Sequence, residues 1–342
     1  MTDCHNQNSQ IREPIDAVIT WVDGDDPSHR QRLAAYLSSL GKDLPSSAVS
    51  TRFRQCGELE YCVASILKNA SWIRHIYIVT DNQVPPFIRH GLPAALKGRV
   101  SLIDHHTIFQ GYEEVLPVFS CRPIETLLWR IPDLASRFIY FNDDMMVTHP
   151  VTPEDFFRQE AIVLRGAWRR MSENTLGYRL KQTRLIRYLR NRTNVKRAGH
   201  TRMQELSAIA IDFDQCYFHL PHQPYNAIRE TQERLFSERP EWLRLNLQYK
   251  LRDSKQLWSF GLSTHDALKN KAAIIDNRLR SQLIKTEGSS YIKIKYLLNR
   301  VRKDRMRAFI CIQGLDNTTL RNRKLIFDWL DMHIGGIDSL SL

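Results

Sequence analysis

Two adjacent carboxylates follow an apolar stretch of this sequence. The segment FIYFNDDMMV, residues 138–147, runs into Asn142, Asp143 and Asp144 and then becomes apolar again. Asn and Asp are common in turns, so a strand that ends in a turn is one interpretation. The other is a site for Mg²⁺ or Mn²⁺, which prefer oxygen ligands. Because successive strand residues point to opposite faces, only one aspartate is expected to be a ligand unless the strand has already ended.

Two earlier segments show the same change from apolar to acidic residues. In IDAVITWVDGDD the apolar run 17–22 leads to Asp23, Asp25 and Asp26, and in IRHIYIVTDNQ the run 76–79 leads to Asp81. Such short runs are typical of strands buried in a parallel sheet. A helical apolar face between them predicts a strand–helix–strand order. We therefore predict a doubly wound, mostly parallel α/β domain, with the aspartates converging at the carboxyl ends of the strands.

The remaining segments predict further elements. Residues 99–109 and 205–218 have the character of strands, and residues 120–138 predict a helix that Pro132 ends or bends. Thr152 would cap a helix in TPEDFF. The C-terminal half is expected to be largely helical, with a last short strand and turn in 307–320.

The composition is that of a globular chain. Hydrophobic residues make up 42% and charged residues 25% of the 342 residues, and no apolar run is long enough to cross a bilayer. The N-terminus lacks the apolar core of a secretory signal. The six cysteines form no CxxC pair, so we expect reduced thiols in a soluble cytoplasmic protein rather than a disulfide framework or a zinc site.

The net charge of +12 favours anionic partners. A basic stretch runs from Arg165 to Arg202, with Glu173 as the only acidic residue between them. This stretch could be a solvated surface, could bind a polyanionic product, or could contact the inner face of a membrane. A nucleic-acid-binding protein is a rival interpretation, but no zinc finger or RNA-binding signature is present, and no nucleic-acid partner is expected.

Several motifs resemble those of the Stealth family, the bacterial capsular polysaccharide phosphotransferases. The same motifs are similar to the catalytic chain of the eukaryotic N-acetylglucosamine-1-phosphotransferase. The segment DAVITWVDGDDP resembles the first region, and residues 52–85 together with 116–157 resemble the second. The third resembles HLPHQPYNAIRE with YKLRDS, and the fourth, more weakly, FICIQGLDN. The resemblance spans residues 16–317 apart from the basic stretch.

This resemblance implies a fold and a reaction. The fold would be a nucleotide-sugar-binding domain of the GT-A or Rossmann-like type with helical elaborations. The reaction would transfer a sugar-1-phosphate from a UDP-hexose, for example UDP-N-acetylglucosamine, to a hydroxyl of an anionic glycan, with Mg²⁺ or Mn²⁺ as cofactor. Repeated transfer would build a phosphodiester-linked capsular or extracellular polysaccharide. The alternative is a metal-dependent glycosyltransferase that releases the nucleoside diphosphate.

The resemblance also implies roles for the strand-end residues. Asp143 and Asp144 would hold the metal, with Asp143 also serving in catalysis. Asn142, Asp23 and Asp26 would contact the substrate. An ordinary tight turn remains the alternative for Asp-Gly-Asp-Asp-Pro, residues 23–27.

The third region supplies a candidate base and a candidate cation. Both His219-Leu220-Pro221 and His222-Gln223-Pro224 fit the family's His-x-Pro motif. An imidazole with a pKa of about 6.5 suits proton removal near neutral pH, so the family's histidine is a candidate general base. We favour His219 for this role because Pro221-His222 follows it, and we expect His222 to contact the substrate. Arg252 would stabilise the transferring phosphoryl group, unless it is an exposed helical arginine.

The fourth region departs from the family. An Asn-Asp dipeptide is expected directly after FICI, but Gln313, Gly314 and Leu315 precede Asp316 here. Asp316 could fill the catalytic role from a longer turn, or the role could be lost. Arg52 and Arg54 would bind the donor phosphates, or would instead pair with Glu58 or Glu60 on the surface.

The motifs suggest five parts of the chain: a flexible tail (1–14), an α/β nucleotide-sugar-binding half (15–160), a basic helical or loop insertion (161–204), a largely helical second half of the catalytic domain (205–330) and a C-terminal tail (331–342).

Overall fold

The computed structural model describes residues 13–41, 56–89, 91–93, 96–172 and 199–339. The first twelve residues of the predicted N-terminal tail lie outside these ranges. The predicted donor-binding residues Arg52 and Arg54 and positions 173–198 of the basic stretch lie outside them as well.

A five-stranded sheet forms the centre of the protein. Its order is β10-β4-β1-β2-β3, with β1 to β4 parallel and β10 antiparallel to β4. Because β2 and β4 lie on opposite sides of β1, the chain reverses its winding direction there, as in doubly wound folds. The predicted α/β class with a mostly parallel sheet is confirmed. The strands are β1 (Ile15–Thr20), β2 (Ile76–Thr80), β3 (Val100–Asp104), β4 (Arg137–Asn142) and β10 (Tyr225–Ile228).

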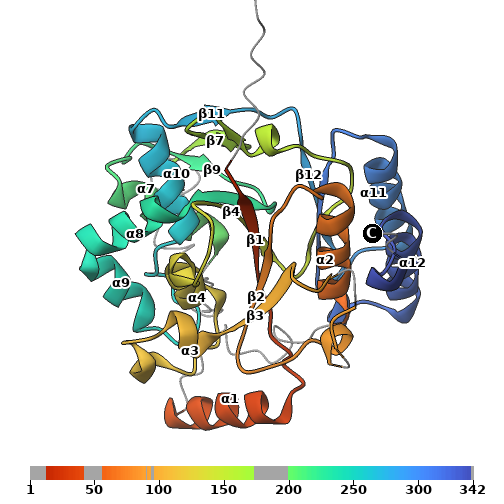
Figure 1. Ribbon diagram of the computed structural model, residues 1–342, viewed down its shortest axis with the longest axis horizontal. Helices are drawn as coiled ribbons and strands as arrows, with labels where there is room; N and C mark the ends of the chain where they lie inside the picture. The colour runs from red at the N-terminus through yellow and green to blue at the C-terminus, as the bar shows by residue number, and fades with distance from the viewer. Residues whose placement is uncertain (1–12, 42–55, 90, 94–95, 173–198, 340–342) are drawn as a thin grey trace, which may run out of the picture.

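Helices cover both faces of this sheet (Figure 1). One side carries α2 and the C-terminal pair α11 and α12, and the other carries α4 and α7 to α10. Apolar side chains at helical spacing, such as Leu59, Val63 and Ile66, are buried against the sheet. The helices are α1 (Pro27–Ser39), α2 (Glu58–Asn69), α3 (His105–Ile108), α4 (Cys121–Leu127), α7 (His200–Ala210), α8 (Arg229–Glu238), α9 (Pro240–Leu247), α10 (Ser259–Lys269), α11 (Tyr291–Lys303) and α12 (Leu320–His333).

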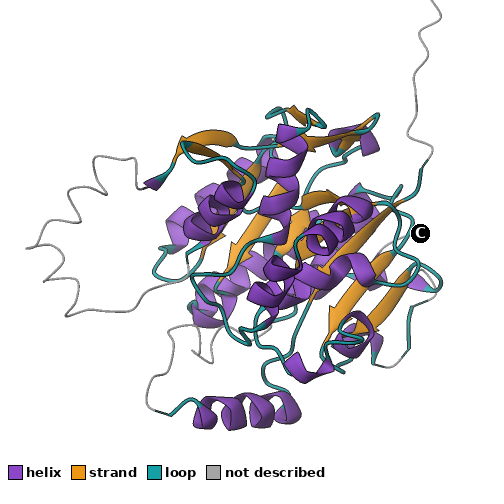
Figure 2. Ribbon diagram, turned by 90° about the vertical axis from the view of Figure 1, so that its left-hand side faces the viewer, coloured by secondary structure: helices purple, strands orange, loops and turns teal. Residues whose placement is uncertain are grey.

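Three smaller sheets extend the fold (Figure 2). Their orders are β11-β7-β6, β12-β13-β5 and β8-β9. The second is important for the site, because β5 follows β4 directly and pairs with β13 from the C-terminal region. The strands are β5 (Met145–Val147), β6 (Phe157–Arg158), β7 (Ala161–Leu164), β8 (Ala167–Arg170), β9 (Cys216–His219), β11 (Ala273–Ile275), β12 (Ser281–Lys285) and β13 (Phe309–Gln313).

Two predicted elements are corrected by the structure. Within the predicted strand 205–218, the first half lies in helix α7, and only Cys216–Phe218 belong to a strand. Asp212 has φ +70°, a left-handed conformation that ends the helix and turns the chain into β9. Thr152 does form a capping box with Asp155, but it starts a single 3₁₀ turn (Pro153–Asp155) rather than a helix.

The C-terminal region is ordered beyond the predicted boundary at residue 330. Helix α12 continues to His333, and a 3₁₀ turn follows at Ile337–Ser339. Ile337 is buried, and its backbone N–H donates to Glu60 Oε1 of α2. None of the helices in the described ranges is both long and apolar enough to cross a bilayer.

Candidate active site

The four parallel strands end at one edge of the central sheet. Thr20 at the end of β1 is in register with Asn142 at the end of β4 and with Val79 of β2. Thr80, the last residue of β2, is in register with Asp104 of β3. The polar residues that follow these strands therefore gather along the carboxyl edge, where doubly wound folds bind their ligands.

Asp143 and Asp144 form a two-residue turn between β4 and β5. Because β4 ends at Asn142, the alternation of a strand no longer separates the two carboxylates, and both remain available to one ligand. The side chains of this turn are half-buried. The predicted turn is present, and its surroundings indicate whether it has a further role.

Burial and neighbouring carboxylates raise the pKa of both aspartates. Burial is the main cause for Asp143, whose pKa is raised well above its usual value, and Asp144 and Glu58 add to the shift. Burial raises the pKa of Asp144 to about 6, although a hydrogen bond from Cys311 opposes the shift. Cys311 Sγ donates to Asp144 Oδ2 at 3.4 Å, whereas the buried Oδ1 has no hydrogen-bond partner. A buried carboxylate oxygen without a partner is costly, so this arrangement favours binding of a cation or proton.

Glu58 is a third carboxylate whose charge acts on the Asp143-Asp144 turn. It is the first residue of α2, is 8% exposed, and accepts a hydrogen bond from Cys56 N at 2.5 Å. Its charge raises the pKa of both Asp143 and Asp144. The sequence suggests Glu58 only as an ion-pair partner of Arg52 or Arg54, although its position after the RFR motif is a usable signal.

Asp316 and Asp25 approach the same cluster from other segments. Burial is the main cause of the raised pKa of Glu58, and the charge of Asp316 adds to it. The Oδ2 atom of Asp316 is buried without a hydrogen-bond partner. Burial raises the pKa of Cys56 to about 11, with smaller contributions from Glu58, Asp316 and Asp25. The longer turn after β13, with Gly314 at φ +80°, thus brings Asp316 to the edge of the cluster despite the departure from the family pattern.

Arg252 supplies a positive charge that acts on Asp144. Its Nη2 donates to Cys121 Sγ at 3.4 Å, and its charge lowers the pKa values of Asp144, Glu125 and His222. Arg252 lies in the loop after α9 and is half-buried, so the alternative of an exposed helical arginine is wrong.

The two candidate histidines occupy different surroundings. His222 is within the electrostatic range of Arg252, and burial followed by Lys285 and Arg252 lowers its pKa. His219 lies at the end of β9, where burial and then Arg169 lower its pKa to about 4. The ring of His200 stacks on His222 at 4.6 Å and lies edge-on to His219 at 6.4 Å. His222 is therefore the histidine that the fold associates with Arg252.

A buried hydrogen-bond network fixes Asn142. Tyr140 Oη lies 2.8 Å from Asn142 Oδ1, 2.8 Å from Thr20 Oγ1 and 3.0 Å from Glu125 Oε1. Burial raises the pKa of Glu125. A tyrosine has one hydroxyl proton, so Tyr140 cannot donate to both Asn142 and Glu125. Both contacts are satisfied when a protonated Glu125 donates to Tyr140 Oη and Tyr140 donates to Asn142 Oδ1. Sequence reasoning missed Tyr140 and Glu125, which lie among apolar residues in the chain.

Asp23 and Asp26 have structural partners. Asp23 Oδ1 accepts from Asp25 N at 2.9 Å, which closes an Asx turn. Asp26 is the N-cap of α1 and accepts from His29 N at 2.8 Å. The tight-turn interpretation of this segment is thus confirmed, while substrate contact by either residue remains a prediction.

Asp81 belongs to a separate cluster at the same edge. Its Oδ2 lies 2.6 Å from Arg32 Nη2 and 3.5 Å from His29 Nδ1, and its Oδ1 lies 4.0 Å from His105 Nδ1. Burial would raise the pKa of Asp81, but the hydrogen bonds from His29 and Arg32 lower it to about 2. The strand-end aspartates therefore divide into a paired group at Asp81 and a poorly neutralised group at Asp143 and Asp144.

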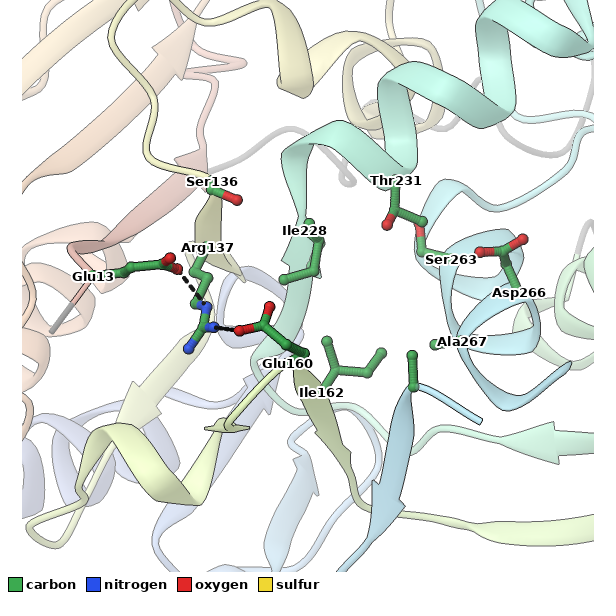
Figure 3. A pocket seen from close by; sticks show the side chains of 12 residues that line it. Glu13, Ser136, Arg137, Glu160, Ile162, Ile228, Thr231, Ser263, Asp266 and Ala267 are labelled. Carbon is green, nitrogen blue, oxygen red and sulfur yellow. Dashed lines mark ion pairs between the residues drawn. The ribbon is translucent and has the colours of Figure 1, made fainter. Parts of the chain in front are cut away.

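A cavity of about 210 Å³ lies at the opposite end of β4 (Figure 3). Arg137, the first residue of β4, forms ion pairs there with Glu13 at 3.1 Å and Glu160 at 3.5 Å. None of the predicted site residues that the structure describes lines this cavity. It is therefore distinct from the acidic cluster at the carboxyl edge.

The acidic cluster fits a divalent cation with few protein ligands. Within the described ranges, no three His, Cys, Asp or Glu residues are grouped so that they could enclose a metal ion. Mg²⁺ is commonly held by one or two carboxylates together with substrate phosphates, and the adjacent Asp143 and Asp144 match that requirement. The unpartnered Asp144 Oδ1 supports the same interpretation.

The fold and the site define an α/β protein with a carboxylate-rich site at the carboxyl edge of its sheet. Comparison with known proteins confirms the predicted resemblance: residues 13–41 match conserved region 1 of the Stealth proteins, and residues 52–164 match conserved region 2. The chain thus carries the first two conserved regions of Stealth proteins. Its resemblance to the third and fourth regions remains a prediction.

Relatives named as polysaccharide phosphotransferases match part of the chain. The chain is 43% identical over 152 residues to an exopolysaccharide phosphotransferase of Streptomyces coelicolor, covering 44% of this chain and 27% of that protein. It is 38% identical over 157 residues to the capsular polysaccharide phosphotransferase cps1A of Actinobacillus pleuropneumoniae, covering 46% of this chain and 42% of that protein. The matches therefore span less than half the length of these relatives.

Among solved structures, the galactosyltransferase LgtC in complex with donor and acceptor sugar analogues is similar, with a TM-score of 0.45 and 13% identity over 93% of this chain and 96% of that one.

Proposed function

We propose that this chain transfers a sugar-1-phosphate unit from a nucleotide sugar to a hydroxyl of a glycan acceptor. The donor would be a UDP-hexose such as UDP-N-acetylglucosamine, and the product a phosphodiester-linked capsular or extracellular polysaccharide. The identity of 38–43% to relatives named as polysaccharide phosphotransferases supports this activity. The five cysteines in the described ranges are free thiols, which is in keeping with a cytoplasmic reaction.

The observation that carries the proposal is the environment of Asp144. Its Oδ1 is buried without a hydrogen-bond partner, beside Asp143 and within the influence of Glu58 and Arg252. This arrangement is unfavourable for an empty turn, because it concentrates negative charge away from solvent. It suits a site that receives a cation together with an anionic substrate.

The residues divide the chemical work of phosphoryl transfer. The acceptor oxygen would attack the phosphorus next to the sugar, the bond to the bridging oxygen would break, and UMP would leave with that oxygen. A divalent cation held by Asp143 and Asp144 would supply positive charge to the phosphate oxygens. Arg252 would stabilise the charge of the transferred phosphoryl group. His222, with its lowered pKa, would accept the proton of the acceptor hydroxyl.

The remaining residues would position the donor. Asn142, fixed through its Oδ1 by Tyr140, would direct its amide nitrogen toward the donor phosphates. Asp316, with its unpartnered Oδ2, would contact the sugar or the acceptor from the turn after β13. We propose His222 as the base in place of His219, because of its association with Arg252.

Leaving-group analysis tests this proposal. The purified chain would be incubated with Mg²⁺, a panel of UDP-sugars and a capsule-like oligosaccharide, and the nucleotide product would be identified. We expect UMP together with a lengthened acceptor, and loss of both in EDTA. UDP in place of UMP would show glycosyl transfer and overturn the proposal.

Matched variants connect the reaction to the site. Asp144→Asn is expected to abolish UMP release, whereas Asp212→Asn, which alters an exposed carboxylate paired with Lys269, is expected to retain it. Equal activity of the two variants would remove Asp144 from the mechanism.

A further inference from the structure

Helix α11 presents an unusual surface to solvent. Its inward face consists of Ile294, Leu298 and Val301, which are buried. Because an α-helix has 3.6 residues per turn, these buried positions determine which of the other side chains point toward solvent. The outward arc has Ile292 and Tyr296 near its centre, one turn apart, with basic residues around them. The basic residues are Lys293, Lys295, Arg300, Arg302 and Lys303.

The apolar residues on this arc are among the most exposed large hydrophobic side chains of the described surface. Ile292 is 78% exposed and Tyr296 is 63% exposed. The five most exposed large hydrophobic side chains in the described ranges all lie on or beside α11 and α12, and Met306, Leu320 and Met332 complete this set. Single exposed hydrophobic residues are common, but their concentration on one pair of helices indicates a contact surface.

The charge of the arc is of one sign. None of its five cations forms an ion pair with a carboxylate in the described part of the chain. The nearest acidic residue in the sequence, Asp304, is already engaged by Arg280 and Arg307 at 3.2 Å. The arc therefore keeps its full positive charge for an external partner.

We propose that the outward arc of α11 docks this protein on an anionic lipid bilayer. The lysines and arginines would contact lipid phosphates, while Ile292 and Tyr296 would enter the boundary between headgroups and acyl chains. Aromatic and aliphatic side chains surrounded by cations are suited to that boundary, because each cation can keep its charge at the phosphate level. This surface is independent of the proposed transfer chemistry and of residues 173–198.

The exposed side chains favour a bilayer over a soluble polyanion. A polyanionic glycan would be bound by the cations alone and would leave Ile292 in water. A bilayer removes both apolar side chains from water and neutralises the cations at the same time. Helix α11 lies beside α12 at one side of the molecule, opposite α9, so a flat surface can approach it (Figure 1).

Vesicle co-sedimentation tests the docking surface. The full chain would be mixed with vesicles of phosphatidylcholine alone or with phosphatidylglycerol, at several salt concentrations. We expect binding to the phosphatidylglycerol vesicles that weakens as salt rises. The double variant Lys293→Glu/Lys295→Glu should lower the partition coefficient at least about tenfold. Ile292→Ser/Tyr296→Ser keeps the charge and should also reduce binding.

The controls separate this surface from general positive charge and from catalysis. Arg244→Glu changes one exposed cation of α9, on the opposite side of the molecule, and should bind vesicles nearly as the parent does. The two α11 double variants and Arg244→Glu should release UMP with a soluble acceptor at the same rate as the parent chain. Unaltered vesicle binding in both α11 double variants would overturn the proposal. The proposal would also be overturned if the parent chain bound soluble polyphosphate but not vesicles, and if the Lys293→Glu/Lys295→Glu variant lost that polyphosphate binding.

Discussion

Cys311 Sγ lies 3.4 Å from Asp144 Oδ2, although the two residues are 167 positions apart in the sequence. The contact arises because β13 pairs antiparallel with β5, the strand that follows the Asp143-Asp144 turn. A strand from the C-terminal region thus forms one wall of the candidate site. The thiol hydrogen bond lowers the pKa of Asp144 against the larger effect of burial, which raises it to about 6.

Asp144→Asn is predicted to change activity and stability in opposite directions. Transfer should fall by at least about a hundredfold, because a cation ligand is lost. The free energy of unfolding at pH 7 in EDTA should rise by on the order of 1–3 kcal/mol, because the folded state disfavours the charged carboxylate. Urea unfolding and product assays would measure the two effects.

The raised pKa of Asp144 also predicts how stability depends on pH. Its folded pKa of about 6 exceeds that of an ordinary aspartate, so the folded state binds the proton more tightly. The parent chain should therefore lose stability as pH rises from about 4 to about 6, and the Asn variant should lack this component. If Asp144→Asn destabilises the fold and leaves transfer intact, the turn is structural.

His222→Ala and His219→Ala are predicted to differ in their kinetics. Removal of the proposed base at His222 should lower kcat about 10²–10⁴-fold with little change in donor affinity. His219→Ala should have a smaller effect, because its neighbours are Arg169 and the other histidines rather than Arg252. Steady-state kinetics with donor titration would compare the two variants.

The lowered pKa of His222 also predicts how kcat/KM depends on pH. The neutral imidazole persists below pH 6.5, so the acidic limb of kcat/KM should lie below that value and should disappear in the His222 variant. A greater loss in His219→Ala would return the base to His219.

Tyr140→Phe is predicted to weaken both the core and the donor site. The substitution leaves Thr20, Glu125 and Asn142 without their shared hydroxyl. We expect the free energy of unfolding to fall by about 1–3 kcal/mol and the donor KM to rise, because Asn142 is no longer oriented. Tyr296→Phe, at an exposed position of α11, serves as the control for stability and KM. Equal behaviour of the two variants would exclude a positioning role for Tyr140.

His265 is predicted to make the fold sensitive to acid. Its Nδ1 donates to Gly261 O at 2.7 Å, and its Nε2 accepts from Phe218 N at 2.9 Å, which requires the neutral ring. Burial lowers its pKa to about 4. Because the unfolded histidine binds a proton at about pH 6.5, stability should be lost as pH falls from 6.5 toward 4, by on the order of 2–3 kcal/mol.

Urea unfolding at pH 7 and pH 5 would measure this loss. His265→Gln should reduce the difference between the two pH values, while the same change at the exposed His106 should preserve it. An unchanged pH dependence in His265→Gln would place the acid sensitivity elsewhere.

Local sequence patterns are sufficient to predict the strands that carry the site. Apolar runs followed by Asp and Asn predicted β1, β2 and β4 and the gathering of their polar ends, because strand burial and turn formation depend on neighbouring residues. The apolar run before Asp212 suits either a helix or a strand, so local patterns could not place the boundary between the two elements. The left-handed conformation of Asp212 marks that boundary in the structure.

Contacts between distant segments of the chain determine which strand-end acid remains poorly neutralised. Asp81 is paired with Arg32 and two histidines, whereas Asp144 meets Glu58 and Cys311. These neighbours come from the start of α2 and from β13, and no short-range pattern links them to β4. Pairing between distant strands sets such contacts. The balance of burial and charge that distinguishes the two aspartates therefore follows from the complete fold.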